Sequence, residues 1–210
     1  MTSINIILVI NTAIAFAGVG YAFLREKPSA FLKKPSGLLS PVSYLIFWPY
    51  FILNTLAFSL FRLFSQENTI DEIVPNLYMG YKLWTIDYKR FMSLNIKSTL
   101  DLTSEFGEVG FIRTRQNYLC MPLLDTKAPT LNQLEEAVSW ITLRLLEGPV
   151  FVHCALGHGR SGTIIAGFLI KHGIVKDVKD AIQFIKTKRP GVGLHPKQLH
   201  ILEQFAKCCI

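Results

Sequence analysis

The chain has 210 residues, of which half are hydrophobic and 18% are charged, with a formal net charge of +7. Soluble proteins usually carry about 25% charged residues, so this composition excludes a disordered chain and argues against a purely soluble one. The charges are unevenly distributed, because residues 1–61 hold only five of them. We therefore expect a membrane anchor over 1–61, a polar linker over 62–72 and a mildly basic globular domain over 73–210.

Two uncharged apolar runs, residues 4–24 and 38–61, occupy the N-terminal third. Each is long enough for a membrane-spanning helix, which needs about 20 apolar residues. The second run contains Pro41, Pro49 and several aromatic residues in mid-segment, which is less usual for a spanning helix. We predict a hairpin of two transmembrane helices. One span followed by an interfacial or re-entrant segment remains the alternative.

The globular part alternates between strand-like and helix-like segments. Short apolar runs predict strands over 73–80, 96–102, 118–124 and 149–152. Amphipathic or apolar runs with capping and stop signals predict helices that begin at Thr85, Thr130, Ser161, Asp177 and Pro196. This alternation indicates an α/β fold with a central, mostly parallel sheet flanked by helices.

The segment VHCALGHGRSG, residues 152–162, follows a predicted buried strand and opens an apolar helix. Open α/β sheets bind ligands at such strand ends. Gly157 and Gly159 let backbone N–H groups converge on an anion, and the helix N-terminus adds its positive dipole. Arg160 supplies a planar pair of donors that matches phosphate oxygens. Cys154 lies at the rim of this positive cup as a thiolate nucleophile, and such chemistry needs no metal or other cofactor.

These residues carry a family resemblance. His153-Cys154, five residues, and Arg160-Ser161 resemble the His-Cys-(x)5-Arg-Ser/Thr signature of the cysteine-dependent protein tyrosine phosphatases. More narrowly, the chain resembles dual-specificity phosphatases, because 76–80 is similar to their opening strand and 189–190 to the end of their penultimate helix. The resemblance covers about 73–205 and implies a metal-independent phosphomonoesterase.

The resemblance implies catalytic roles for four residues. Cys154 would form a phosphocysteine, Arg160 would bind the phosphoryl group, and Ser161 would hydrogen-bond the departing thiolate. Asp125, which follows an apolar strand 29 residues before the cysteine, would be the general acid and then the base. Asp101 is a rival acid that lies inside a predicted strand, and Asp125 could instead be a turn residue.

Neighbouring residues would support these groups. The substrate phosphate would be held by Arg160 and by the loop residues Ala155, Leu156, Gly157, His158 and Gly159. His153 would orient the backbone near Cys154, and Glu105 could orient Arg160 or lie in a solvated loop. The His158 ring could touch substrate or face solvent. Cys120 is expected in the core, with a disulfide to Cys154 as the alternative.

The leading hypothesis for the substrate is a phosphoprotein, on tyrosine and also serine or threonine. A lipid phosphomonoester such as phosphatidylglycerophosphate is the alternative, for which the membrane hairpin is the argument. A catalytically inactive phosphate-binding module is a third hypothesis, which the catalytic set argues against. The loop contains no lysine, which disfavours a highly charged inositide. The membrane bilayer is an expected partner, nucleic acid is not, and the sequence does not indicate an oligomeric state.

The side of the membrane depends on residues 25–34, which contain four Lys or Arg. Basic loops favour the cytoplasm, so two spans would place this loop inside and the globular domain on the non-cytoplasmic face. An exposed thiolate is better preserved in a reducing compartment, which favours the opposite orientation. The sequence gives a weak preference for the non-cytoplasmic face, and a re-entrant second segment would return the domain to the cytoplasm.

Overall fold

The computed structural model describes residues 3–114 and 117–209, and its centre is a five-stranded sheet of order β1-β2-β5-β3-β4. β2, β5, β3 and β4 run parallel, and β1 pairs antiparallel with β2 at one edge. The strands are β1 (Ile70–Val74), β2 (Leu77–Tyr81), β3 (Ser98–Thr103), β4 (Tyr118–Leu123) and β5 (Val150–Cys154). The expected mixed α/β fold with a mostly parallel sheet is confirmed.

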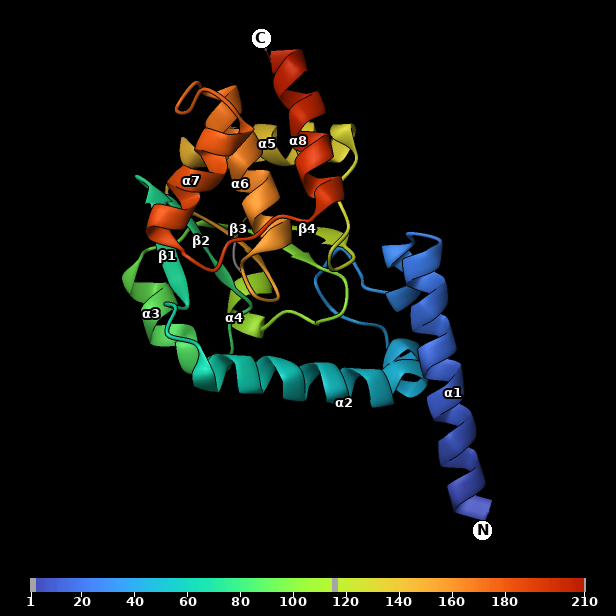
Figure 1. The fold of residues 1–210 in the computed structure, drawn as a ribbon. Coiled ribbons are helices and arrows are strands. Elements are labelled where there is room, and N and C mark those ends of the chain that lie inside the picture. The colour runs from blue at the N-terminus through green and yellow to red at the C-terminus, as the bar shows by residue number, and fades with distance from the viewer. Residues whose placement is uncertain (1–2, 115–116, 210) are drawn as a thin grey trace.

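Helices cover both faces of the sheet (Figure 1). One face carries α5 (Leu131–Leu145), α6 (Gly159–Lys171), α7 (Val178–Lys188) and α8 (Pro196–Cys209) over the largest hydrophobic cluster. The other face carries η2 (Thr85–Asp87), α3 (Tyr88–Ser93) and α4 (Gly110–Arg113) over a smaller cluster around Phe91 and Phe151. The capping box of Thr130 and Gln133 at the start of α5 and the Asp177 cap of α7 form as the sequence predicts.

The predicted strand over 73–80 is divided into two strands. Asn76 adopts a left-handed conformation with φ of 67°, which turns the chain between β1 and β2. Asparagine tolerates this conformation better than other non-glycine residues. The apolar pattern continues across the turn, so it could not reveal the break.

The N-terminal third forms α1 (Ser3–Leu24), η1 (Pro28–Phe31) and α2 (Pro41–Phe64). Both α1 and α2 are long and apolar enough to cross a membrane. α1 projects away from the domain toward its N-terminus, whereas α2 lies across one end of the catalytic domain (Figure 1). Phe58 of α2 packs in one cluster with Tyr81, the last residue of β2, and with Phe106 and Ala155, which follow β3 and β5.

The segment that connects α1 to α2 is bound to the catalytic domain. The Lys33 ammonium lies 2.6 Å from Asp101 Oδ2 of β3, and Lys127 Nζ lies 3.1 Å from Glu26 Oε1. A loop that makes these contacts lies on the same side of any membrane as the domain. The predicted hairpin of two spans would place residues 25–34 across the bilayer from the domain, and it stays a prediction, since both helices are long enough to span. The contacts of residues 26 and 33 with the domain favour the alternative of one span followed by an interfacial or re-entrant segment.

Candidate active site

The loop that contains the signature lies between β5 and α6. Cys154 is the last residue of β5 and is buried, and α6 begins at Gly159. Gly157 has φ of +65°, and a Cβ at this position would lie 2.4 Å from the Gly80 carbonyl. Only glycine fits this close approach, so the sequence folds the loop tightly against the end of β2. The first turn of α6 then directs its free N–H groups and its dipole at the loop.

Arg160 is fully buried and rigidly held. Its guanidinium donates from Nη1 to Glu105 Oε2 at 2.9 Å, from Nη2 to Glu105 Oε1 at 2.7 Å, and from Nη1 to the Leu123 carbonyl at 2.9 Å. Burial alone would raise the pKa of Glu105, but the facing guanidinium outweighs burial and lowers it. Burial likewise opposes the charge of Arg160, yet Glu105 raises its pKa. The predicted partner of Arg160 is thus in place as a charged, bidentate pair.

Two buried polar atoms at this site have no hydrogen-bond partner among the described residues: Arg160 Nε and Ser161 Oγ. Buried donors are normally paired, so unpaired ones call for an explanation. Both belong to the start of α6, immediately after the signature loop. They are the groups that a phosphate oxygen and the Cys154 sulfur would satisfy.

The two candidate acids have different environments. Asp125 follows β4, and its side chain is 63% exposed, with Oδ1 3.3 Å from Arg160 Nη2. Asp101 is fully buried in β3 and accepts hydrogen bonds from Lys33, Thr103 and Tyr118. Only Asp125 lines the pocket beside the signature loop. The geometry therefore favours Asp125 over Asp101 as the proton donor.

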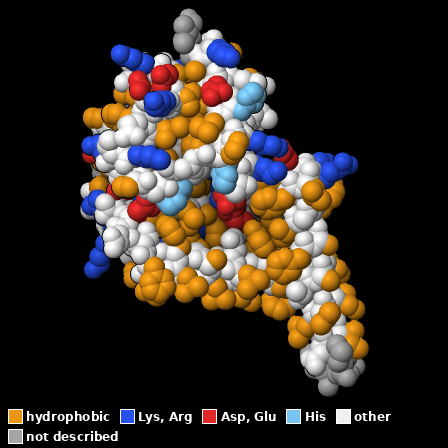
Figure 2. Space-filling model, in the orientation of Figure 1, with side chains coloured by type: hydrophobic (Ala, Val, Ile, Leu, Met, Phe, Trp, Pro, Cys, Tyr) orange, Lys and Arg blue, Asp and Glu red, His pale blue; other side chains and the backbone are white. Residues whose placement is uncertain are grey.

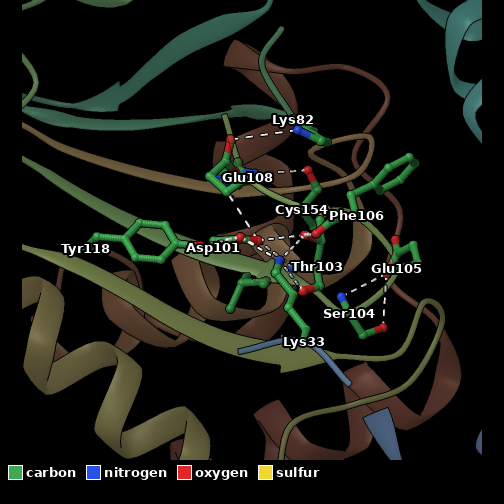
Figure 3. A network of polar contacts seen from close by, with 12 residues as sticks. Lys33, Lys82, Asp101, Thr103, Ser104, Glu105, Phe106, Glu108, Tyr118 and Cys154 are labelled. Atoms are coloured by element: carbon green, nitrogen blue, oxygen red, sulfur yellow. Dashed lines mark hydrogen bonds and ion pairs between the residues drawn. The ribbon is translucent and has the colours of Figure 1, made fainter. Parts of the chain in front are cut away.

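Figure 3 shows a buried polar network near Cys154 that includes Asp101 and Glu108. His153, which is also buried, contacts this network. Its Nδ1 lies 3.3 Å from the Cys154 carbonyl oxygen, and its Nε2 lies 3.0 Å from Glu108 Oε2. The ring stacks on Phe151, with centroids 5.2 Å apart. These contacts fix the ring next to the nucleophile, as the resemblance implies.

Asp101, Glu108 and His153 bring three possible metal-binding atoms within 4.8 Å of one another. Lysine ammonium groups already neutralise the two carboxylates, because Lys33 bonds Asp101 and Lys82 Nζ lies 3.7 Å from Glu108 Oε1. Burial would raise the pKa of Asp101, but Lys33 and His153 lower it well below its ordinary value. We interpret the cluster as an ion-pair network that ties the α1–α2 loop to the strand beside Cys154.

The His158 ring is held by Glu67 and by α2. Its Nε2 lies 2.6 Å from Glu67 Oε2, and its ring packs edge-on against Phe61 of α2 at 5.7 Å. It therefore ties the signature loop to the segment that follows α2.

Arg189 also holds this loop, and sequence reasoning assigned it no role. Its Nε donates to the Gly157 carbonyl at 2.8 Å, its Nη2 donates to the Leu156 carbonyl at 3.0 Å, and it pairs with Asp71. Its position beside Pro190 marked only the end of a helix.

Cys120 lies too far from Cys154 for a disulfide. Cys120 of β4 pairs with Asp101 of β3, which pairs with His153 of β5. Two strand spacings amount to about 9.5 Å, beyond the roughly 7 Å limit between the Cα atoms of a disulfide. Burial, assisted by Asp101, raises the pKa of Cys120 to about 11.

A pocket of about 220 Å³ opens beside the signature loop and is shared between α2 and the catalytic domain. The domain contributes residues that follow three strand ends: Glu105, Phe106, Asp125, Thr126, Ala155 and Leu156. α1 and α2 contribute Phe23, Tyr50, Asn54, Ala57, Phe58 and Phe61. The helix that the sequence indicates as a membrane span therefore forms one wall of the site. The only early signal was its unusual content of mid-segment aromatic residues.

A family model for the catalytic domain of dual-specificity phosphatases matches residues 77–208, which is more than half of the chain. The chain belongs to the dual-specificity phosphatase family. It is thus a phosphoric monoester hydrolase, as the signature loop indicates.

Among curated proteins, the chain is similar to phosphatidylglycerophosphate phosphatase PTPMT2 of Arabidopsis thaliana, with 28% identity over 83% of this chain and 78% of that protein. Phosphatidylglycerophosphatase and protein-tyrosine phosphatase 1 of Rattus norvegicus is 33% identical over 50% of this chain and 52% of its own length. Human dual specificity protein phosphatase 4 is 29% identical over 56% of this chain but only 30% of its own length.

Solved structures of the family share the fold. The crystal structure of PTPMT1 in complex with PI(5)P has a TM-score of 0.61 and 22% identity, covering 68% of this chain and 97% of that one. The active form of Tk-PTP has a TM-score of 0.60 and 23% identity, covering 66% of this chain and 97% of that one.

Proposed function

We propose that this phosphatase works at a membrane surface and removes a monoester phosphate from a glycerophospholipid, with phosphatidylglycerophosphate as the first candidate. The observation that carries this proposal is the position of α2. One face of α2 forms a wall of the active-site pocket, and its other face is apolar and exposed. A soluble phosphoprotein would need no such surface beside the site.

The exposed face of α2 has the character of a membrane-contacting surface. Its exposed side chains are uncharged and, apart from Thr55, predominantly hydrophobic, and they include Val42, Leu45, Trp48, Ile52, Leu53, Leu56, Leu60 and Leu63 at helical spacing. Figure 2 shows this band continuing onto the projecting half of α1 without Lys, Arg, Asp or Glu side chains. An exposed apolar surface of this extent indicates a binding surface, and its lack of charge favours lipid.

The size of the pocket suits a lipid head group. Its volume of about 220 Å³ is below the roughly 300–1,000 Å³ of sites that enclose a drug-sized ligand. The phosphate and the polar group next to it fit inside such a space, whereas acyl chains would remain outside. The apolar faces of α1 and α2 would hold those chains in the bilayer.

The relatives support the same proposal. The match to PTPMT2 covers 83% of this chain, a larger share than residues 62–210 can supply, so it extends into the N-terminal helices. The match to human dual specificity protein phosphatase 4 covers 56%. PTPMT2 thus shares more of this architecture than dual specificity protein phosphatase 4 does, although the match to the rat phosphatidylglycerophosphatase covers 50% of the chain.

The proposed reaction has two steps. The Cys154 thiolate attacks phosphorus, and the bond between phosphorus and the glycerol oxygen breaks as Asp125 gives that oxygen a proton. Asp125 then takes a proton from water, which attacks phosphorus and breaks the P–S bond. Arg160 Nε and the loop N–H groups of residues 155–159 hold the phosphoryl oxygens. Ser161 Oγ donates to the thiolate as it leaves.

The proposed membrane arrangement is one span followed by an interfacial helix. α1 would cross the bilayer and α2 would lie in its surface, so residues 25–34 and the catalytic domain share one side. The four basic residues of that loop favour the cytoplasmic side.

A C-terminal fusion to a reporter active only in the cytoplasm should give signal. Signal only from an export-dependent reporter would contradict the arrangement.

The substrate is tested by assaying the full chain in mixed vesicles against three substrates: phosphatidylglycerophosphate, a phosphotyrosine peptide and a phosphothreonine peptide. Cys154→Ser is the control, and it should release no phosphate from any of them. The proposal expects the highest kcat/KM for the lipid. A higher value for either peptide would overturn the lipid assignment and favour the phosphoprotein alternative.

A further inference from the structure

Two polar side chains of α2 line the pocket beside the catalytic loop: Tyr50 and Asn54. They lie four residues apart, so they share one face of the helix. The catalytic-domain model of the family begins at residue 77, so neither belongs to the machinery that the family shares. The other α1 and α2 side chains that line the pocket are apolar. The presence of these two hydrogen-bonding groups therefore requires an explanation.

Asn54 has an unused donor. Its Nδ2 is buried and has no hydrogen-bond partner among the described residues. Apart from Tyr50, the other α2 side chains that line the pocket are Ala57, Phe58 and Phe61, which offer no acceptor. A buried amide donor without a partner costs free energy, and a ligand that accepts from it would remove that cost.

The Tyr50 ring is fixed by aromatic neighbours. It stacks on Phe31 with centroids 5.5 Å apart, and Phe16 meets it edge-on at 6.5 Å. Tyr50 lines the same pocket as Glu105 and Asp125. The phenol is therefore held in the pocket beside the signature loop.

We infer that Asn54 and Tyr50 form a subsite for the hydroxyl and ester oxygens of the glycerol that carries the phosphate. This inference rests on the proposed function. An amide and a phenol bind neutral hydroxyls, and the residues identified as lining the pocket include no Lys or Arg but do include Glu105 and Asp125. Such a site favours a neutral hydroxyl next to the phosphate and disfavours a second phosphomonoester on the same glycerol.

Asn54→Leu and Tyr50→Phe test the subsite, because each removes the polar group and keeps a similar volume. Each variant should lower kcat/KM for phosphatidylglycerophosphate by about three- to tenfold, the effect of losing one hydrogen bond. The loss should be smaller for p-nitrophenyl phosphate, which has no glycerol. Ser59→Ala is the matched control, since the Ser59 hydroxyl bonds the Thr55 carbonyl of its own helix and the residue is absent from the pocket lining.

The thermal unfolding midpoint separates this role from a structural one. Because Asn54 Nδ2 has no partner in the part of the chain that the structure describes, Asn54→Leu should leave the midpoint unchanged or raise it. A lowered midpoint with equal losses on both substrates would overturn the inference, as would an unchanged kcat/KM for the lipid. A wild-type chain that hydrolyses no glycerol phosphate lipid would overturn the proposed function and the subsite together.

Discussion

The Arg160 guanidinium is oriented before substrate arrives, because Glu105 and the Leu123 carbonyl occupy both of its terminal nitrogens. Its Nε is left to face the phosphate site. Donors fixed in this way need little rearrangement in the transition state, which is the usual source of electrostatic catalysis. Asp125 differs from this rigid set, since its carboxylate is largely exposed at the pocket rim.

Asp125→Asn should slow the hydrolysis of alkyl phosphates more than that of aryl phosphates. An alkoxide leaves poorly without a proton, whereas p-nitrophenolate leaves without help, so the alkyl loss should be about 10²–10⁴-fold and the aryl loss much smaller. Steady-state rates with phosphatidylglycerophosphate and p-nitrophenyl phosphate measure the difference. Equal losses on both would assign Asp125 a structural role.

Lys33→Met should destabilise the protein, because it leaves the buried Asp101 carboxylate without its cation. Breaking one partner of a buried ion pair costs about 3–5 kcal/mol. Urea unfolding in detergent, followed by circular dichroism, gives the free energy of unfolding. Lys34→Met is the matched control, since Lys34 is exposed and should change stability little. A Lys33→Met chain as stable as the control would refute the docking of the α1–α2 loop.

The Glu67 carboxyl makes the free energy of unfolding of the protein depend on pH. Burial would raise its pKa, but the hydrogen bond with His158 and the charge of Arg189 lower it below the ordinary 4.5. A carboxyl with a lowered folded pKa contributes stability above its unfolded pKa and loses it as pH falls through the folded value. Glu67→Gln should therefore reduce stability at neutral pH and flatten its decline below pH 4.5. Parallel pH–stability curves for the two proteins would contradict this assignment.

Helix α2 explains both what the sequence could predict and what it could not. Its length and lack of charge predict an apolar helix, and the structure contains one over Pro41–Phe64. The periodicity of apolar residues could not show whether the helix spans a membrane or packs on the domain, because both of its faces are apolar. The structure separates the faces by burial, since Phe47 and Phe58 are buried on the domain side while Leu53 and Leu56 are exposed.

Leu56→Glu should weaken membrane-dependent activity, because it places a charge on the exposed apolar face of α2. Vesicle sedimentation should show reduced binding, and the rate on phosphatidylglycerophosphate vesicles should fall by about fivefold or more, since the variant loses apolar contact area with the bilayer. The rate on soluble p-nitrophenyl phosphate should persist. Leu146→Glu is the control, as an exposed leucine at the end of α5. Equal vesicle rates for both variants would show that α2 does not contact lipid.

The molecule as a whole joins segments that are far apart in sequence. The signature loop was predictable because its residues are consecutive and its glycines dictate its shape. The bond of Arg160 to Glu105 joins residues 55 positions apart, and that of Lys33 to Asp101 joins residues 68 apart. The first was anticipated through the family resemblance. The bond of Lys33 to Asp101 was not anticipated, because the composition of the N-terminal third predicted a hairpin with residue 33 across the membrane from the domain.

The membrane-surface account also explains why the N-terminal third and the catalytic domain pack together. α2 closes the active-site pocket on one side and offers an apolar face on the other, so in the proposed arrangement catalysis and membrane binding would share one element. A phosphate group in the pocket would then lie at the level of the lipid head groups, within reach of Cys154.

The most direct test compares phosphatidylglycerophosphate in vesicles with its deacylated, water-soluble counterpart, which has the same phosphate and glycerol groups. If the substrate is taken from the bilayer, the full chain should have a kcat/KM about tenfold or more higher for the acylated form, because binding energy from its acyl chains at the membrane promotes the reaction. Equal values for the two forms, or a preference for the soluble one, would contradict a membrane-surface lipid phosphatase.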